Sequence, residues 1–190
     1  MPRCNAPIPD DTLLDYWARD LAEGHETDSV EEHLFACADC SARLHSVASL
    51  GLRLATLVRQ GRVSGMVTRA ILNRAQRDGV HVRLYSLRPG EAAPCACFPG
   101  DDLMVASLRA DFSGVDAVTL SVRGPGDSTV SEVHEVPVSG SESEVLWAMP
   151  AAVVRQMPSM QLRLTIASAG PTRTELGRYV LDHSASERPM

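Results

Sequence analysis

Three side chains that commonly bind metal ions, His33, Cys37 and Cys40, occur within eight residues of the sequence. Residues four apart share one face of a helix, so a helix through this stretch would place His33 beside Cys37, with Cys40 a short turn later. Imidazole and thiolate ligands favour a tetrahedral zinc ion, whereas calcium and magnesium prefer oxygen ligands. The spacing therefore predicts a zinc (Zn2+) site in the segment 33–40.

A closed structural zinc site needs a fourth protein ligand. Cys4 is the nearest upstream thiol and His25 is the rival candidate, and spacing alone does not decide between them. Two other interpretations exist for Cys37 and Cys40: a redox-active Cys-x-x-Cys pair, or two unrelated buried thiols. The histidine four residues before Cys37 favours zinc over both.

Two segments carry a resemblance to a known family. The segment 9–17 (PDDTLLDYW) resembles the first helix of the zinc-binding anti-sigma domain of bacteria, and the segment 29–40 (SVEEHLFACADC) resembles its second helix and metal turn, whose usual form reads HLxxCxxC. The resemblance covers about residues 5–79. That family usually has a histidine or cysteine just before the first helix, where this chain has Ile8; Cys4 lies four residues earlier on a proline-rich lead.

The resemblance implies a fold, a cofactor and a partner. In that family a small helical domain binds an extracytoplasmic-function sigma factor and keeps it from RNA polymerase. The matching zinc ligands here are His33, Cys37 and Cys40. The resemblance also implies a fourth helix that is detached from the other three and rests on the partner.

Length and composition suit a soluble globular protein of one ordinary domain or two small ones, with 190 residues of which 44% are hydrophobic. No apolar run approaches the ~20 residues that span a bilayer, and the N-terminus lacks the basic lead and apolar core of a signal peptide. Five cysteines, two pairs of them close in sequence (Cys37/Cys40 and Cys95/Cys97), favour metal or thiol chemistry in a reducing compartment over a disulfide framework. We therefore expect a cytoplasmic protein.

The charge pattern argues against nucleic acid as the main partner, because phosphate binding needs a basic surface and the net charge is -6. All 18 basic residues are arginine. Residues 1–40 contain ten acids and two arginines, whereas residues 41–77 contain seven arginines and no acid. Either the acidic and basic helices pair within a bundle, or one of these faces docks a charged partner such as a DNA-binding protein.

Apolar residues at helical spacing predict four helices in the first part of the chain. The expected ranges are about 9–22, 29 to the metal turn, 39–60 and 64–79. Ser29 with Glu32 forms a candidate capping box for the second helix, and Ser64 can cap a fourth that includes Met66 and Val67. These helices would form a small zinc-binding bundle over residues 1–79.

From Val80 the apolar period changes to two, which is typical of strands. About seven short strands separated by Gly and Pro turns, including strands at about 129–138, 143–149 and 174–182, predict an antiparallel β-sandwich of immunoglobulin-like architecture. The expected fold class is thus α+β, with the bundle over 1–79, the β-sandwich over 80–183 and a flexible tail over 184–190.

The remaining motifs give weaker signals. Cys95 and Cys97 are expected in a loop, as a sensor pair, a second metal site or simply two small side chains. No nucleophile elbow or phosphate-binding glycine loop is evident, so the sequence favours no enzyme activity.

The favoured hypothesis is a cytoplasmic anti-sigma factor. Its structural zinc could be displaced by oxidation of Cys37 with Cys40 or Cys4, and its β-sandwich would sense a signal or make a second contact. The direct partner would be a sigma factor, with no nucleic acid and no membrane. The alternatives are an interaction adaptor with a purely structural zinc domain, and a thiol-redox protein.

Overall fold

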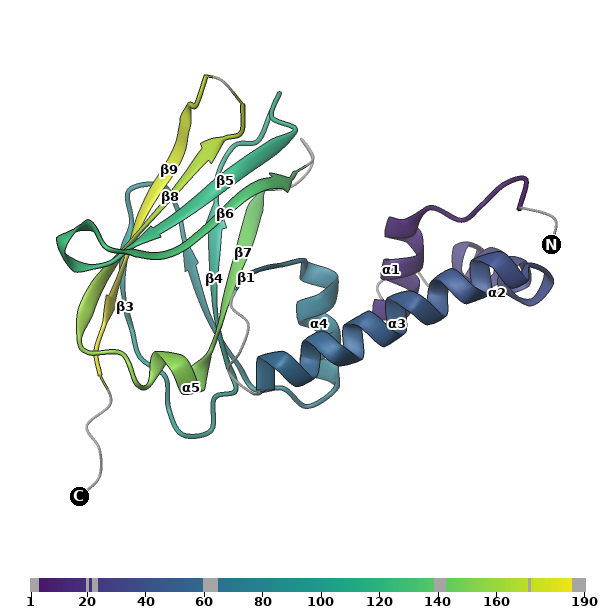
Figure 1. Ribbon diagram of the computed structural model, residues 1–190, viewed down its shortest axis with the longest axis horizontal. Helices are drawn as coiled ribbons and strands as arrows, with labels where there is room; N and C mark the ends of the chain where they lie inside the picture. Colours follow the sequence, from purple (N-terminus) through teal and green to yellow (C-terminus); the bar gives the residue numbers. More distant parts are fainter. Residues whose placement is uncertain are drawn as a thin grey trace. The chain divides into compact units, whose positions relative to one another are not determined.

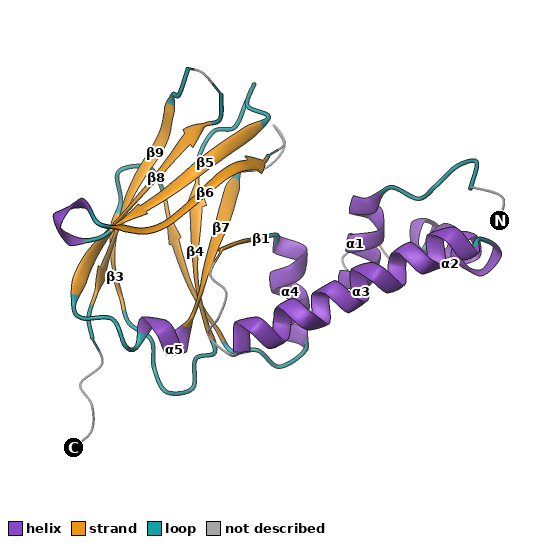
Figure 2. Ribbon diagram, in the orientation of Figure 1, coloured by secondary structure: helices purple, strands orange, loops and turns teal. Residues whose placement is uncertain are grey.

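The structure of the protein is a computed structural model that describes residues 4–19, 21, 24–59, 65–138, 143–170 and 172–185. Helices occupy the N-terminal part of the chain and two β-sheets the C-terminal part (Figures 1 and 2), which confirms a mixed α+β protein. The chain divides into two compact units, Met1–Leu57 with Arg69–Gly79 and Val58–Thr68 with Val80–Met190. We call them the helical unit and the β unit.

Four helices make up the helical unit: α1 (Asp10–Ala18), α2 (His25–Ala36), α3 (Ala38–Arg59) and α4 (Arg69–Arg77). A small apolar cluster joins the proline-rich segment before α1 (residues 4–9, called the lead) to the first three helices. Its buried members are Ile8, Leu13, Val30 and Cys40. Partly buried apolar side chains, among them Tyr16 and Leu44, pack around this cluster.

The second helix begins earlier than its sequence predicts. Gly24, with φ at 108°, precedes the first residue of α2. The negative charges of Glu26 and Asp28 in the first turn stabilise the helix, because the amino-terminal end of the helix dipole is positive. Ser29 therefore lies inside α2, and the predicted capping box does not form the start of the helix. The predicted first and third helices agree with α1 and α3 more closely.

The fourth helix also differs from its prediction, because Met66 and Val67 lie in strand β1 (Gly65–Val67) and the helix starts only at Arg69. Residue 64, the predicted cap, lies outside the described residues. The helix is not detached in this structure but packs on α1. The Arg74 guanidinium lies 5.5 Å from the ring centroid of Trp17 and donates to the Trp17 carbonyl oxygen at 3.2 Å.

Arg77 donates to the carbonyl oxygen of Ala18, the last residue of α1. Carbonyl groups at the end of a helix lack partners within that helix, so the two arginines of α4 supply the missing donors. The polar side of α4 is thereby used to hold α1.

Gly51 allows α1 and α3 to approach closely. A Cβ atom at this position would lie 2.4 Å from the Cη2 atom of Trp17. Glycine inside a helix costs about 1 kcal/mol relative to alanine, so its presence in α3 has a packing reason. The indole ring of Trp17 is held between α3 and the guanidinium of Arg74.

Two sheets form the β unit. One has the order β1-β7-β4-β2, with β2 (Val82–Leu87), β4 (Leu103–Arg109) and β7 (Glu144–Pro150). The other has the order β3-β9-β8-β5-β6, with β3 (Ala92–Cys95), β5 (Ala117–Arg123), β6 (Thr129–Pro137), β8 (Met160–Ser168) and β9 (Glu175–His183). A 3-10 turn, η1 (Pro125–Asp127), and a short helix, α5 (Ala151–Val154), lie between strands.

One apolar core draws on both sheets, as the predicted period of two requires. Met104 and Trp147 come from the first sheet, and Leu120, Leu164 and Tyr179 from the second; all are buried by at least 99%. The predicted strands at about 129–138, 143–149 and 174–182 are β6, β7 and β9.

The sheets are not antiparallel throughout, which corrects the predicted antiparallel sandwich. Strand β2 pairs with β4 in parallel, and β3 pairs with β9 in parallel. Strands β1 and β3 were not predicted, because three or four residues show too little alternation to be recognised. Among the helices described, none has the length and apolar character needed to cross a bilayer.

We predict that Gly51→Ala destabilises the helical unit by about 1 kcal/mol. Overpacking of a closely packed site costs about 1 to 3 kcal/mol and exceeds the gain of about 1 kcal/mol in helix propensity. Urea unfolding followed by helical ellipticity measures the change. Gly100→Ala is the control, because a Cβ atom there meets no atom within 4 Å. A Gly51→Ala variant as stable as the unchanged protein would contradict the packing argument.

Candidate metal centre

The metal turn is a one-residue break between two helices. Helix α2 ends at Ala36, Cys37 has extended φ and ψ angles of -119° and 102°, and α3 begins at Ala38. The Cys37 amide still donates to the His33 carbonyl oxygen at 2.8 Å, and the Ser41 amide donates to the Cys37 carbonyl oxygen at 3.1 Å. The backbone therefore stays hydrogen bonded while the chain changes direction at Cys37.

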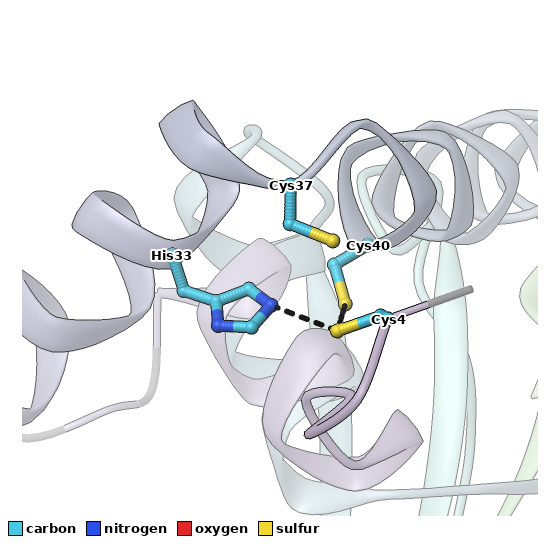
Figure 3. Close-up of side chains that lie close together, drawn as sticks. All are labelled: Cys4, His33, Cys37 and Cys40. Carbon is cyan, nitrogen blue, oxygen red and sulfur yellow. Dashed lines mark hydrogen bonds between the residues drawn. The ribbon is translucent and has the colours of Figure 1, made fainter. Parts of the chain in front are cut away.

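Four side chains converge at this turn (Figure 3). One ligand atom each from Cys4, His33, Cys37 and Cys40 lies within 4.8 Å of the others. The Cys4 Sγ atom is 3.5 Å from His33 Nε2 and 4.0 Å from Cys40 Sγ. Tetrahedral zinc with ordinary bond lengths separates its ligand atoms by roughly 3.5 to 3.8 Å. The four side chains thus fit a metal ion with small adjustments.

The structure brings together the three ligands predicted from spacing and Cys4, the thiol named above as a candidate fourth ligand. His25, the rival candidate, is an exposed residue at the start of α2 and does not belong to the group. Ile8 is only 7% exposed and packs in the apolar cluster of the helical unit. The lead thus uses Ile8 to fill the core and Cys4 to reach the metal turn.

The thiols of the group have unequal acidity. Hydrogen bonding from the backbone amide of Cys40 is the main cause that lowers the pKa of Cys37 to about 7, with further contributions from Cys4, His33 and the Asp39 amide outweighing burial. Burial raises the pKa of the Cys4 thiol. Because the thiolate is the form that binds a metal ion, Cys37 is the ligand best prepared at neutral pH.

The second cysteine pair has the opposite character. Cys95, the last residue of β3, and Cys97 just after it are 2% and 1% exposed, and burial raises the pKa of each thiol to about 11. The Cys95 Sγ atom lies 3.9 Å from His183 Nδ1. Among the residues described, Cys4, His33, Cys37 and Cys40 form the only group of three or more close metal-binding side chains. The Cys95/Cys97 pair is therefore protonated at neutral pH and reacts slowly.

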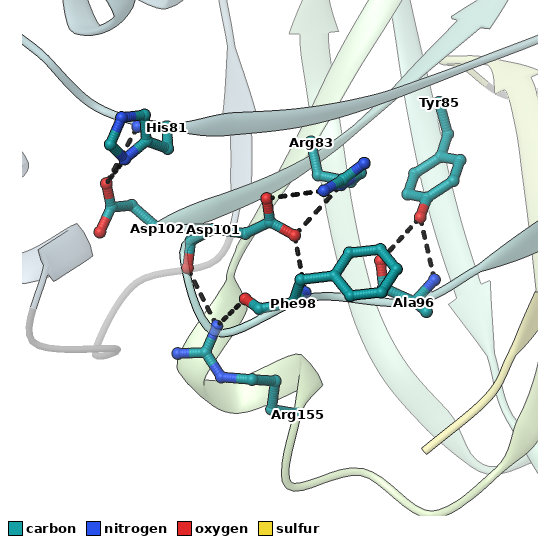
Figure 4. Close-up of polar contacts among 8 residues, drawn as sticks. All are labelled: His81, Arg83, Tyr85, Ala96, Phe98, Asp101, Asp102 and Arg155. Carbon is teal, nitrogen blue, oxygen red and sulfur yellow. Dashed lines mark hydrogen bonds and ion pairs between the residues drawn. The ribbon is translucent and has the colours of Figure 1, made fainter. Parts of the chain in front are cut away.

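Polar contacts hold the loop that follows Cys97 (Figure 4). Asp101 pairs with Arg83 at 3.1 Å, and Arg155 donates to the carbonyl oxygens of Phe98 and Asp101 at 2.9 Å. Burial pushes the pKa of Asp101 upward, but the hydrogen bonds from Arg83 and the Phe98 amide outweigh it and keep that pKa below its usual value. No sequence pattern indicates this role of Asp101, because it depends on contacts with residues distant in sequence.

A groove of about 670 Å³ opens within the helical unit among α1, α2 and α3. Its lining is partly apolar, with some polar side chains. Residues on it include Tyr16, Trp17, Leu21, Glu31, Leu44 and His45. The Tyr16 hydroxyl donates to Glu31 Oε1 at 3.2 Å, which links α1 to α2 along this groove.

Comparisons with known proteins do not assign the chain to a family. No protein-family model matches the sequence, and no curated protein matches it. Among solved structures, the chain is similar to the N-terminal domain of phage TP901-1 ORF48 with a TM-score of 0.35 and 9% sequence identity, over 55% of this chain and 99% of that one. So low a TM-score does not bear on fold or function.

We predict that Cys37 in the metal-free, reduced protein is alkylated with a midpoint near pH 7. Its pKa falls from 9.0 to about 7 on folding, so the thiolate stabilises the folded state fully above pH 9.0, and this stabilisation is lost as the pH falls through about 7. The measurement is the rate of iodoacetamide labelling of each cysteine, read by mass spectrometry. A midpoint for Cys37 close to 9 would contradict the effect of the α3 backbone amides.

A second labelling experiment concerns Cys97. We predict that Asp101→Asn speeds its alkylation in the folded protein roughly tenfold, because weakening the contact with Arg83 lowers the cost of opening the loop by about 1.4 kcal/mol. Asp102→Asn removes the same charge from the next residue, which contacts His81 and not Arg83, and serves as the control. Equal rates in both variants would show that Asp101 does not keep the thiol covered.

Proposed function

We propose that the protein is an anti-sigma factor whose helical unit binds an extracytoplasmic-function sigma factor and keeps it from RNA polymerase. The convergence of Cys4, His33, Cys37 and Cys40 supports this proposal most strongly, because it joins a fourth ligand, Cys4, to the three that the resemblance of segment 29–40 implies. In this proposal the cofactor is a structural Zn2+ ion and the direct partner is a protein, not nucleic acid or a membrane.

The ligand set favours scaffolding over catalysis. Three thiolates and an imidazole complete a tetrahedral zinc site and leave no open position for a substrate. Such an ion would tie the lead, the end of α2 and the start of α3 together. Structural zinc contributes roughly 10 to 16 kcal/mol in finger-sized peptides, comparable with the ~5 to 15 kcal/mol stability of a whole domain. Loss of the ion would therefore remove a large part of the stability of the helical unit.

The groove of the helical unit suits a helix of the partner. Tyr16, Trp17 and Leu44 offer apolar contacts. The lining also has one acid, Glu31, and one base, Arg19, and residues 1–40 as a whole are rich in acids. A sigma factor binds DNA and presents basic surfaces, so an acidic surface can occupy them. Phe35 on α2 and Leu50 on α3 are 92% and 59% exposed and add apolar area on the same unit.

For the β unit we propose a sensing or second binding role in the cytoplasm. Its immunoglobulin-like architecture stays a prediction, from which the parallel pairing of β2 with β4 departs. A thiol-redox protein is the alternative that one observation favours, since the pKa of Cys37 is about 7. Zinc bound to Cys37 would oppose that activity. An interaction adaptor would keep its partner after the helical unit is removed.

The test is co-expression of the full chain with an extracytoplasmic-function sigma factor. We predict copurification of the two proteins with about one zinc ion per chain, and inhibition of transcription by the sigma-containing polymerase. Cys37→Ser should lose zinc and binding together, because one of the four ligands is missing. Cys97→Ala, which changes a buried thiol of the β unit, should retain both. A zinc-loaded chain that neither binds nor inhibits a cognate sigma factor would overturn the proposal.

A further inference from the structure

Arg43 connects a ligand sulfur with an acidic side chain at the start of α1. It lies three residues after Cys40 on α3 and therefore on the same helix face. One terminal nitrogen of its guanidinium group donates to Cys40 Sγ at 3.9 Å, and the other donates to Asp10 Oδ1 at 2.5 Å. Neither Arg43 nor Asp10 belongs to the four metal-binding side chains.

The net charge that the four ligands and a bound Zn2+ ion would carry explains why a positive side chain lies beside them. Three thiolates and one neutral imidazole around Zn2+ leave one excess negative charge. A guanidinium group beside a ligand sulfur offsets that charge and donates a hydrogen bond to it. Only arginine has the planar fork that can hold a sulfur and a carboxylate through two different nitrogens; the ammonium of lysine is a single point.

The Asp10–Arg43 pair has little reason to exist for stability alone. The Asp10 side chain is 84% exposed and that of Arg43 is 31% exposed, and exposed ion pairs contribute little. The contact does, however, fix the direction of the guanidinium group toward Cys40. Partners of this kind around a metal site orient the ligands, and their loss typically weakens metal binding about 10 to 100-fold.

We propose that Arg43 is a positioning residue of the metal centre: it holds the sulfur of Cys40 in place and offsets the excess charge, and Asp10 keeps Arg43 in that orientation. This inference rests on the proposed zinc site and extends it. Retention of the ion thereby depends on the first helix, since Asp10 is the first residue of α1. Displacement of α1 would loosen the ion without any change in the ligands.

The experiment measures metal affinity in the full-length chain by competition with a chromogenic chelator, using Zn2+ and, for its visible spectrum, Co2+. We expect Arg43→Gln to bind Zn2+ about tenfold more weakly or worse, Arg43→Lys to lie between Arg43→Gln and the unchanged protein, and Asp10→Asn to weaken binding by several-fold. In the Arg43→Gln background, Asp10→Asn should have no further effect, because Asp10 acts through Arg43.

Arg53→Gln is the matched control. It removes the same charge from an exposed position on α3, about 15 Å further along the helix, and should leave affinity unchanged. Helical ellipticity checks that each variant folds. If Arg43→Gln does not fold, the affinity of Arg43→Lys tests the role of Arg43 instead. The tetrahedral Co2+ spectrum reports whether the four ligands remain in place independently of affinity.

Two results would overturn the inference in distinguishable ways. If the unchanged protein gives a tetrahedral Co2+ spectrum and Arg43→Gln binds Zn2+ equally well, the role of Arg43 is wrong while the metal centre stands. If the unchanged protein gives no such spectrum, the metal centre itself fails and the role of Arg43 falls with it. Additive effects of Asp10→Asn and Arg43→Gln would also contradict a role of Asp10 through Arg43.

Discussion

The break at Cys37 is the constraint on which the helical unit depends. In one continuous helix, His33 and Cys40 would be about 10.5 Å apart along the axis, too far to share an ion. The extended angles of Cys37 turn the chain so that all four ligand atoms lie within 4.8 Å of one another. The Ser41 hydroxyl donates to the Leu34 carbonyl oxygen at 2.5 Å, which satisfies a group left without a partner at the end of α2. The turn is therefore stabilised by its own hydrogen bonds before any ion binds.

Local residue types predicted much of this site. The spacing of His33, Cys37 and Cys40 and the helical period on either side are local signals, and both agree with the structure. The choice of Cys4 over His25 was not predictable in the same way. It depends on the path of the lead, which is fixed when Ile8 packs in the cluster with Leu13 and Val30. That packing joins residues distant in sequence, and no periodicity encodes it.

The β unit shows the same division between local and distant information. Strands β6, β7 and β9 were predicted from their own residues and from the Gly and Pro turn signals that separate them, because these are local signals. Strands β1 and β3 exist through their partners β7 and β9, each far along the chain. Whether a pair runs parallel or antiparallel is likewise decided by the path of the chain between the strands. The parallel pairs β2–β4 and β3–β9 could therefore not be predicted from sequence patterns.

The two cysteine pairs show how environment, and not spacing, decides thiol chemistry. Backbone amides at the start of α3 bring the pKa of Cys37 to about 7, whereas an apolar core brings that of Cys95 to about 11. The thiol that is most acidic, and the group of side chains that could bind a metal ion, therefore both lie in the helical unit. Helices α2 and α3, with Cys37 between them, hold three of the ligands, and both helices line the groove. Glu31 of α2 accepts a hydrogen bond from Tyr16 of α1. A change at the metal turn that moves α2 must therefore also change the groove.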